Sequence, residues 1–312
     1  MNENFKKNTQ VTFALYAYNQ DKYIREAVEA ILNQDFSCME IILSDDCSSD
    51  RTFEIMKEIV NGYAGQHKVL LIKNATNLGV GNHINNVLNV SSGDIIIHAA
   101  GDDISMPNRA RHIYNHFLKA GAKTAALFSN VLVIDDVGVI NGLFFKKTPN
   151  FSSTIDEFKL NRRCWALGCS LAFRRSIYDK YGELNPNVRQ EDGVLAFRSM
   201  LEGRIDYVDT PLVKYRIHDS NVSQTENSSK LIFLKKNAHF MIRSWHADTL
   251  LSGMKDVGLL KIIEKELFMS LLKKYFFSIP FVGRVYLYSY IKIYFLCRYI
   301  IRKIRRNPHK PI

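Results

Sequence analysis

Short apolar runs alternate with segments of helical periodicity between residues 11 and 119, and this order constrains the fold of the 312-residue chain most strongly. The runs that predict buried strands are residues 11–16, 39–44, 69–72 and 95–99. The segments that predict helices are residues 24–32, a stretch beginning near 51, residues 81–90 and residues 107–119. Such βαβα order in short units predicts a Rossmann-like α/β fold, with a mostly parallel sheet flanked by helices.

Beyond residue 134, where a further strand at 125–134 ends, the pattern is less regular. Residues 141–163 lack a clear period, and we expect an irregular excursion there. Order returns with strand 170–174, helix 192–202, strands 205–208 and 213–217, and a polar loop at 219–229. From residue 231 the pattern is helical to the end. We therefore predict an α/β domain at residues 1–225 and a helical C-terminal region at 226–312.

The net charge of +11 is concentrated near the C-terminal end of the chain. After Glu266 there is no Asp or Glu but there are ten Lys or Arg residues, which leaves 32 basic and 31 acidic residues in the rest. A nucleic-acid-binding protein would need basic residues interleaved with aromatic ones over its body. The nearly neutral body therefore argues against a nucleic-acid partner.

The number and spacing of the cysteines indicate the cellular compartment of the protein. The five cysteines are an odd number without CxxC spacing, which argues against a disulfide framework and a structural zinc site. The first nine residues contain no apolar core or cleavage site of a secretory signal. We expect the protein in the reducing cytoplasm.

One apolar run, at residues 95–100, leads directly into Gly101-Asp102-Asp103. A buried strand that ends in two carboxylates presents hard oxygen ligands at the carboxyl edge of a sheet, where open α/β folds bind ligands. Adjacent carboxylates repel each other unless a cation or hydrogen-bond donors offset their charge. This motif predicts a site for a divalent cation and a diphosphate; a solvated Asp-Asp turn is the alternative.

Polar motifs follow each of the first four strands. They are Tyr16-Ala17-Tyr18-Asn19, Asp45-Asp46-Cys47-Ser48, Asn77-Leu78-Gly79 and Gly101-Asp102-Asp103. Over residues 10–223 their order and spacing resemble glycosyltransferase family 2, inverting sugar transferases of the GT-A fold. The resemblance implies an enzyme that moves a sugar from a nucleotide-sugar donor, such as a UDP-sugar, to an acceptor hydroxyl.

The resemblance also implies roles for residues at the donor side. It assigns Tyr16, Tyr18 and Asp46 to the uridine end of the donor, because a carboxylate can accept the imide N–H of the base. The other residues that it places at the donor are Asn19, Asn77, Gly79 and Asp102. Helix caps and turns favour the same residue types, so a structural role is the alternative for each.

For the cation, Mn²⁺ or Mg²⁺, the resemblance implies that Asp103 is a ligand and that Asp102 belongs to both the ribose and the metal shell. Gly101 stands where the family's usual Asp-x-Asp pattern has its first aspartate. The segment from Arg216 to Ser223 resembles the family's closing segment, whose histidine, here His218, reaches the metal or the diphosphate.

The acceptor side of the resemblance rests on two later motifs. Gln190-Glu191-Asp192 resembles the family's Glu-Asp motif at a helix start, which implies that Asp192 is the general base and that Glu191 contacts the acceptor or supports its loop. Favourable interaction with the helix dipole is the alternative reason for acids there. The remaining residues that it places near the acceptor are Trp165, Gly168, Cys169 and Ser170.

The basic tail suggests a membrane partner. Projected as a helix, residues 281–306 place five basic residues on one side: Arg284, Lys292, Arg298, Arg302 and Arg306. The opposite side is apolar and rich in tyrosine, which is typical of a helix lying in an anionic membrane interface. Packing of this helix on the α/β domain is the alternative.

Three further expectations concern the whole protein. The tail favours a peripheral position on the inner face of the cell membrane and a glycan or lipid-linked glycan acceptor, as in surface polysaccharide biosynthesis. A non-catalytic nucleotide-sugar-binding module is the competing function. Assembly into a homo-oligomer is also possible.

Overall fold

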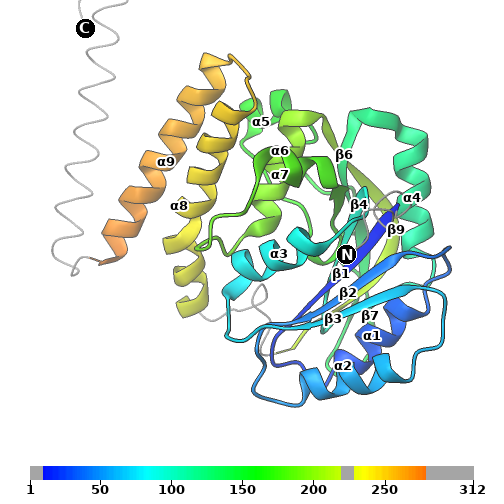
Figure 1. The fold of residues 1–312 in the computed structure, drawn as a ribbon. Coiled ribbons are helices and arrows are strands. Elements are labelled where there is room, and N and C mark those ends of the chain that lie inside the picture. The colour runs from blue at the N-terminus through cyan, green and yellow to red at the C-terminus, as the bar shows by residue number, and fades with distance from the viewer. Residues whose placement is uncertain (1–9, 219–227, 279–312) are drawn as a thin grey trace, which may run out of the picture.

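A computed structural model describes residues 10–218 and 228–278 of the chain (Figure 1). The strands are β1 (Val11–Ala17), β2 (Glu40–Asp45), β3 (Lys68–Lys73), β4 (Ile95–Ala100), β5 (Ile104–Ser105), β6 (Thr124–Ile134), β7 (Ile140–Leu143), β8 (Ala172–Arg174) and β9 (Arg204–Arg216). The helices are α1 (Ile24–Leu32), α2 (Thr52–Asn61), α3 (Gly79–Val90), α4 (Arg109–Ala120), α5 (Ile155–Asn161), α6 (Arg175–Tyr181), α7 (Glu191–Glu202), α8 (Ser228–Leu251) and α9 (Val257–Ser278).

The described strands form one sheet in the order β3-β2-β1-β4-β8-β6-β9-β5, and β7 pairs with β6. The pairs β3-β2, β2-β1 and β1-β4 are parallel, as the βαβα pattern predicts. Strand β8 runs antiparallel between β4 and β6, while β6 and β9 are parallel to each other. The predicted α/β class, a sheet with helices on both faces, is confirmed (Figure 1).

Alternation along the strands divides the core into two layers. Phe13 and Leu15 of β1 point into the layer that includes α1, α2 and α4, whereas Ala14 points into the layer that includes α3, α6 and α7. Strands β2 and β4 alternate in the same way, because successive side chains of a strand lie on opposite faces. Both faces are therefore buried, which explains why these strands read as continuous apolar runs.

Two expectations from the sequence were wrong. Residues 141–163 are not simply irregular, since most of β7 and all of α5 lie within them. The two strands expected at 205–208 and 213–217 are one long strand, β9, whose pairing with β6 shifts register between Ser129 and Val131. The shift accommodates Pro211, which has no backbone N–H for a regular ladder.

The C-terminal helices pack on the layer of α7. Trp245 of α8 stacks on Phe197 of α7 with ring centroids 5.1 Å apart, and Leu259 and Ile263 of α9 belong to the same core cluster. Among residues 10–218 and 228–278, no helix combines the length and apolar character needed to cross a bilayer. The predicted boundary near residue 225 and the predicted tail at 281–306 lie outside the described residues.

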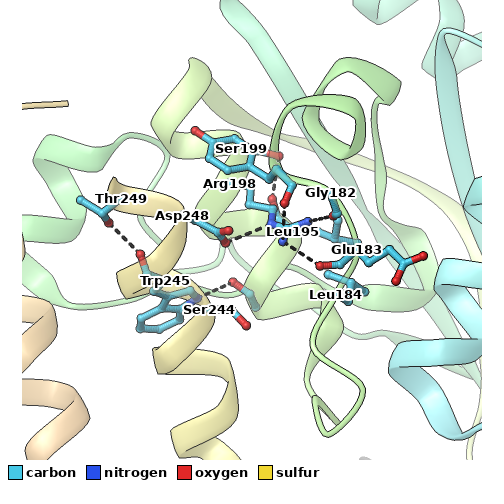
Figure 2. A network of polar contacts seen from close by, with 12 residues as sticks. Gly182, Glu183, Leu184, Leu195, Arg198, Ser199, Ser244, Trp245, Asp248 and Thr249 are labelled. Carbon is cyan, nitrogen blue, oxygen red and sulfur yellow. Dashed lines mark hydrogen bonds and ion pairs between the residues drawn. The ribbon is translucent and has the colours of Figure 1, made fainter. Parts of the chain in front are cut away.

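A buried ion pair joins α8 to α7 (Figure 2). Arg198 Nε lies 3.0 Å from Asp248 Oδ2, and each side chain is only 3% exposed. The guanidinium also donates to the carbonyl oxygen of Gly182 at 2.7 Å, and Trp245 Nε1 donates to that of Gly193 at 3.1 Å. These contacts with α8 thus fix the position of α7, whose first turn carries Glu191 and Asp192.

Candidate active site

The carboxyl ends of three parallel strands meet at one edge of the sheet. Ala17 at the end of β1 is in register with Asp45 of β2, and Tyr16 is in register with Ala100 of β4. The Asp46 N–H donates to the carbonyl oxygen of Ala17 at 2.9 Å. The polar motifs that follow these strands in the sequence are therefore neighbours in space.

Asp46 holds the loop that leads into α3. Its carboxylate accepts hydrogen bonds from Asn74 Nδ2 at 2.8 Å, Leu78 N at 2.9 Å and Gly79 N at 3.0 Å. Asn77 Oδ1 also accepts from Gly79 N, at 3.1 Å, and Gly79 has a positive φ of 73° that favours glycine. A carboxylate has about four lone-pair sites, so Asp46 retains capacity for one further donor.

The end of β1 combines one enclosed and one exposed tyrosine. Tyr16 OH lies 3.3 Å from His98 Nε2, and burial together with the negative charge of Glu191 raises the pKa of Tyr16 well above its ordinary value. Tyr18 is 48% exposed. Asn19, in the left-handed conformation, donates its N–H to Ser48 Oγ at 2.9 Å. Tyr16 also packs against the core cluster that contains Val194 and Leu195, so α7 lies close to the end of β1.

The two aspartates after β4 have different surroundings. Asp102 Oδ2 lies 3.0 Å from His218 Nε2, and these side chains are 13% and 7% exposed. Asp103 is buried, and its Oδ1 accepts from the Arg216 N–H at 2.9 Å. Asp103 Oδ2 has no hydrogen-bond partner among the described residues. Burial and the charge of Asp102 raise the pKa of Asp103 well above its usual range.

This donor set fits a divalent cation in part. Carboxylate oxygens and an imidazole nitrogen are ligands that Mn²⁺ accepts, and the orphaned oxygen of Asp103 is a polar atom still lacking a partner. Within residues 10–218 and 228–278, no group of three or more His, Cys, Asp or Glu side chains is arranged to hold a metal ion. A cation at Asp102 and His218 would thus take its other ligands from phosphate oxygens and water, as Mg²⁺ commonly does.

Two buried arginines stabilise this edge of the sheet, and no sequence motif signals either role. Arg216 Nε donates to the carbonyl oxygen of Asp102 at 3.0 Å, and its Nη2 pairs with Glu26 of α1. Arg109 of α4 is fully buried and donates to the carbonyl oxygens of His98 at 2.7 Å and Cys169 at 3.0 Å. Arg109 thereby ties β4 to the turn at 168–170.

The first turn of α7 carries a pair of carboxylates with altered acidity. Burial and the charge of Asp192 raise the pKa of Glu191 to about 8, and burial raises that of Asp192 to about 6. The pair therefore retains one proton at neutral pH. A Cβ on Gly168 would lie 3.5 Å from Asp192 Cβ and 3.6 Å from Glu191 Oε1, so this turn lies against both acids.

The neighbouring residue, Cys169, connects the pair to the aspartates after β4. The charges of Asp103 and Asp102 add to burial in raising the pKa of the Cys169 thiol well above its usual range. The turn at 168–170 therefore adjoins both acid pairs, because Gly168 lies against Asp192 and Glu191 while Cys169 lies near Asp102 and Asp103.

The other residues expected at the acceptor have structural contacts. Trp165 packs in an aromatic cluster with Phe128 and Phe145, at centroid distances of 5.6 and 5.9 Å. Ser170 is fully buried, and its hydroxyl donates to the carbonyl oxygen of Ser129 at 3.0 Å. Gly168 and Cys169 are thus the residues of this segment that adjoin the carboxylates.

Arg189 is a candidate that the sequence motifs did not single out. It lies three residues before Asp192, and its Nη1 is 3.0 Å from the position that a Cβ on Gly79 would occupy. No ion pair or hydrogen bond of this guanidinium is found within the described part of the chain. An unpaired cation therefore lies between the Asp46 loop and the start of α7.

Sequence comparison identifies the family. The model for Glycosyl transferase family 2 matches residues 12–182. The putative glycosyltransferase EpsE of Bacillus subtilis is 31% identical over 140 residues, covering 45% of this chain and 49% of EpsE, so the match spans about half of that relative. An uncharacterized glycosyltransferase of Haemophilus influenzae is 25% identical over 245 residues, covering 72% of this chain and 71% of that protein.

Solved structures agree on the fold. TarS 1-349 of S. aureus in complex with UDP-GlcNAc aligns with a TM-score of 0.61 at 17% identity, covering 85% of this chain and 72% of the TarS 1-349 chain. The mannosyltransferase PcManGT from Pyrobaculum calidifontis, in complex with GDP-Man and Mn²⁺, aligns with a TM-score of 0.54 at 14% identity, covering 93% of this chain and 82% of that one. At these identities the likeness shows the fold alone. The chain therefore belongs to glycosyltransferase family 2 and has a GT-A-type fold.

Proposed function

We propose that this glycosyltransferase moves a sugar from a UDP-sugar to a hydroxyl of a glycan or lipid-linked acceptor, with inversion at the anomeric carbon. One observation carries the proposal: Gly168 lies against the carboxylates of α7, and the next residue, Cys169, lies near Asp102, which pairs with His218. An inverting transfer needs one base on the side of the acceptor and charge stabilisation on the side of the leaving diphosphate.

The residues of this chain divide the chemistry between them. Asp192 takes the proton of the acceptor hydroxyl as its oxygen attacks the anomeric carbon, while the bond between that carbon and the diphosphate oxygen breaks. With its pKa near 6, Asp192 is ionised at neutral pH yet basic enough to accept a proton. Glu191, which keeps its proton at neutral pH, donates a hydrogen bond to a sugar oxygen.

A divalent cation, Mn²⁺ or Mg²⁺, would be held by Asp102 and His218 next to Asp103, and it supplies positive charge that stabilises the departing diphosphate. Of the two aspartates, we propose Asp102 as the main ligand. Asp103 is buried, and one of its oxygens already accepts the hydrogen bond of the Arg216 N–H.

Support for a uridine nucleotide comes from Asp46 and from TarS. The remaining acceptor site of Asp46 fits an imide N–H, which uracil has. TarS, described above, is solved with UDP-GlcNAc. Titration calorimetry of the full chain with UDP, GDP and dTDP, each with and without Mn²⁺, tests this choice. We expect UDP to bind most tightly and only with Mn²⁺, and Asp102→Asn to remove the Mn²⁺ dependence; tighter binding of GDP would contradict a uridine donor.

Arg189 is expected to bind a phosphate of the donor. Its guanidinium lies next to Gly79 at the N-terminus of α3, where an anion is favoured on electrostatic grounds. A charge-assisted hydrogen bond contributes about 1.5–3 kcal/mol, so Arg189→Met is expected to raise the KM for the donor roughly 10- to 150-fold with little change in kcat.

Steady-state kinetics with varied donor concentration measure the effect of Arg189→Met. Arg189→Lys should recover part of the affinity, because lysine keeps the charge but not the planar fork. Arg111→Met removes an exposed arginine paired with Asp35 and serves as the matched control. An unchanged donor KM in Arg189→Met, or a loss confined to kcat, would contradict donor binding by this residue.

The acceptor and the location belong to the same proposal. We propose an α/β catalytic domain at residues 1–225 and a helical region at 226–312 whose tail, at 281–306, binds an anionic membrane surface on the cytoplasmic side. All acidic or basic side chains after Glu266 are basic, which supports binding of the tail to an anionic surface. A lipid-linked glycan is the acceptor class that such a position favours.

A further inference from the structure

A hairpin beside the site exposes a series of apolar side chains. It consists of the turn after β6, strand β7 and the residues that follow, 135–147, and is named the β6–β7 hairpin below. Val137 is 78% exposed, and Val139 and Ile140 are 57% and 53% exposed. Leu143 and Phe144 are also exposed, at 44% and 37%. Singly exposed apolar residues are common, but five within eight consecutive positions indicate an interaction surface.

The hairpin lacks the charged side chains that protect many sheet edges. All four residues of β7 are exposed, and β7 pairs only with β6 among the described strands. Natural edge strands carry charged residues that prevent association with other chains. From Val137 to Phe145 the sequence contains no charged residue. No charged side chain within residues 137–145 therefore opposes contact of the hairpin with an apolar surface.

Basic residues flank the apolar tip. Lys146 and Lys147 follow it directly, are exposed, and have no ion pair within the part of the chain that the structure describes. The two acids of the turn are already engaged. Asp135 Oδ1 accepts from Val137 N and Val139 N, at 3.0 and 2.8 Å, and Asp136 pairs with Lys22. An apolar tip next to two exposed lysines that form no ion pair among the described residues complements an anionic bilayer interface.

The turn of the hairpin is linked directly to the candidate active site. Arg216 Nη1 donates to the carbonyl oxygens of Asp135 and Asp136, at 3.3 and 3.2 Å. The backbone N–H of the same arginine donates to Asp103 Oδ1. Tyr23, which donates to Asp136, also packs its ring 4.8 Å from that of His218. A surface that docks on this hairpin would therefore lie beside the Asp102–His218 pair.

We propose that the β6–β7 hairpin inserts its apolar tip into the headgroup region of an anionic bilayer and so places the active-site edge next to a lipid-linked acceptor. The part about the acceptor rests on the proposed function, whereas insertion of the hairpin does not. A second copy of this chain, or residues 279–312, could instead cover the same surface, and the test below separates these occupants.

Tryptophan fluorescence of the full chain tests the insertion. Val137→Trp is compared with Leu160→Trp, which places the probe at an 86% exposed position of α5. The vesicles contain phosphatidylcholine with about one third phosphatidylglycerol and brominated acyl chains. We expect a blue shift and quenching for Val137→Trp and neither for Leu160→Trp. Vesicle binding without quenching at position 137, no vesicle binding, or a blue shift that follows protein concentration without vesicles would each overturn the proposal.

A second variant measures how much the tip contributes. The triple variant Val137→Ser, Val139→Ser, Ile140→Ser is expected to weaken binding to anionic vesicles about tenfold, because each lost apolar side chain removes buried area. The control Leu118→Ser, Leu160→Ser alters two leucines elsewhere that are 62% and 86% exposed, and its binding should match the wild type. Equal binding of the triple variant would overturn the proposal.

Donor hydrolysis without vesicles separates this proposal from the proposed function. We expect the wild type and both serine variants to hydrolyse the donor at the same rate, because the altered residues lie outside the site. A wild type without donor turnover would refute the proposed function and leave the insertion result standing. Normal turnover with an unchanged vesicle affinity of the triple variant would refute the insertion alone.

Discussion

The Asp192→Asn variant is expected to lose sugar transfer by a factor of about 10² to 10⁴ while it still binds the donor. Asparagine has nearly the same shape but cannot accept the proton of the attacking hydroxyl. Calorimetry with UDP and Mn²⁺ checks donor binding, and release of UDP in the presence of acceptor checks turnover. Full turnover in Asp192→Asn would show that another group is the base.

The acidity of the carboxylate pair sets the pH profile of the same reaction. Because burial raises the pKa of Asp192 to about 6, the base is protonated and inactive below that pH. We expect kcat/KM of the wild type to rise as pH increases through about 6. Glu191→Gln replaces the protonated carboxyl next to Asp192 with a neutral amide and leaves the base in place, so it should retain more activity than Asp192→Asn. A flat profile between pH 5 and 7 would contradict this role.

Ionisation of the Glu191–Asp192 pair also lowers the stability of the folded protein. The folded state binds protons more tightly than the unfolded chain, whose aspartate pKa is about 3.9, so stability from these groups falls as pH rises from about 4 to 8. Asp192→Asn is therefore expected to raise the free energy of unfolding by about 1–3 kcal/mol at pH 8 and by less at pH 5. Urea denaturation at the two pH values measures the difference. A variant that loses both activity and stability would indicate a structural role for Asp192.

The Asp248→Ala variant is expected to lower the free energy of unfolding by about 3–5 kcal/mol, because it leaves the guanidinium of Arg198 buried without its counter-charge. Burial already raises the pKa of Asp248 despite the opposing effect of Arg198, which shows how strongly this site disfavours charge. Without the ion pair, α8 should hold α7 less firmly. The carboxylates in the first turn of α7 would then be positioned less accurately, and activity should fall. Chemical denaturation and donor turnover measure the two effects.

Two further variants make this prediction specific. Lys180→Met removes an exposed ion pair with Glu202 and should cost at most about 1 kcal/mol, since solvent screens such pairs. The double variant Arg198→Met, Asp248→Leu removes both charges and should be more stable than Asp248→Ala, as found when buried pairs are replaced by apolar side chains. A loss in Asp248→Ala no larger than that in Lys180→Met would contradict the importance of the pair.

The sequence predicted the parallel half of the fold well because three of its strands, β1, β2 and β4, are buried on both faces. Such strands read as unbroken apolar runs, and each is followed by a helix with a clear apolar face. The predicted ends of β1, β2 and β4 also placed the polar motifs at one edge of the sheet correctly.

The later part of the chain was predicted less well because local signals there compete with long-range pairing. The Pro211 in β9 suggests a loop, yet pairing with β6 on both sides continues the strand past it. Helix α5 is short, but a signal for it exists: Thr154 accepts from the Glu157 N–H at 3.3 Å in a Thr-x-x-Glu pattern typical of helix starts.

The buried arginines of the site could not be predicted in this way. Arg109 and Arg216 lie on a helix and a strand whose patterns give no reason to expect a buried charge, and their partners are mostly backbone carbonyl oxygens. A hydrogen bond to a backbone carbonyl oxygen does not require a particular residue type at the partner position, so the sequence carries no sign of it. Arg189 was missed for a similar reason, since its proximity to Gly79 depends on how two distant loops meet.

A crystal of the full chain soaked with UDP and Mn²⁺, measured at a wavelength that shows the anomalous signal of manganese, would test directly whether one cleft serves donor and base. We expect the manganese peak beside Asp102 and His218, the uracil at Asp46, and the free end of the diphosphate directed toward Asp192. A nucleotide bound elsewhere, or bound with its diphosphate away from Asp102 and Asp192, would contradict the proposed chemistry.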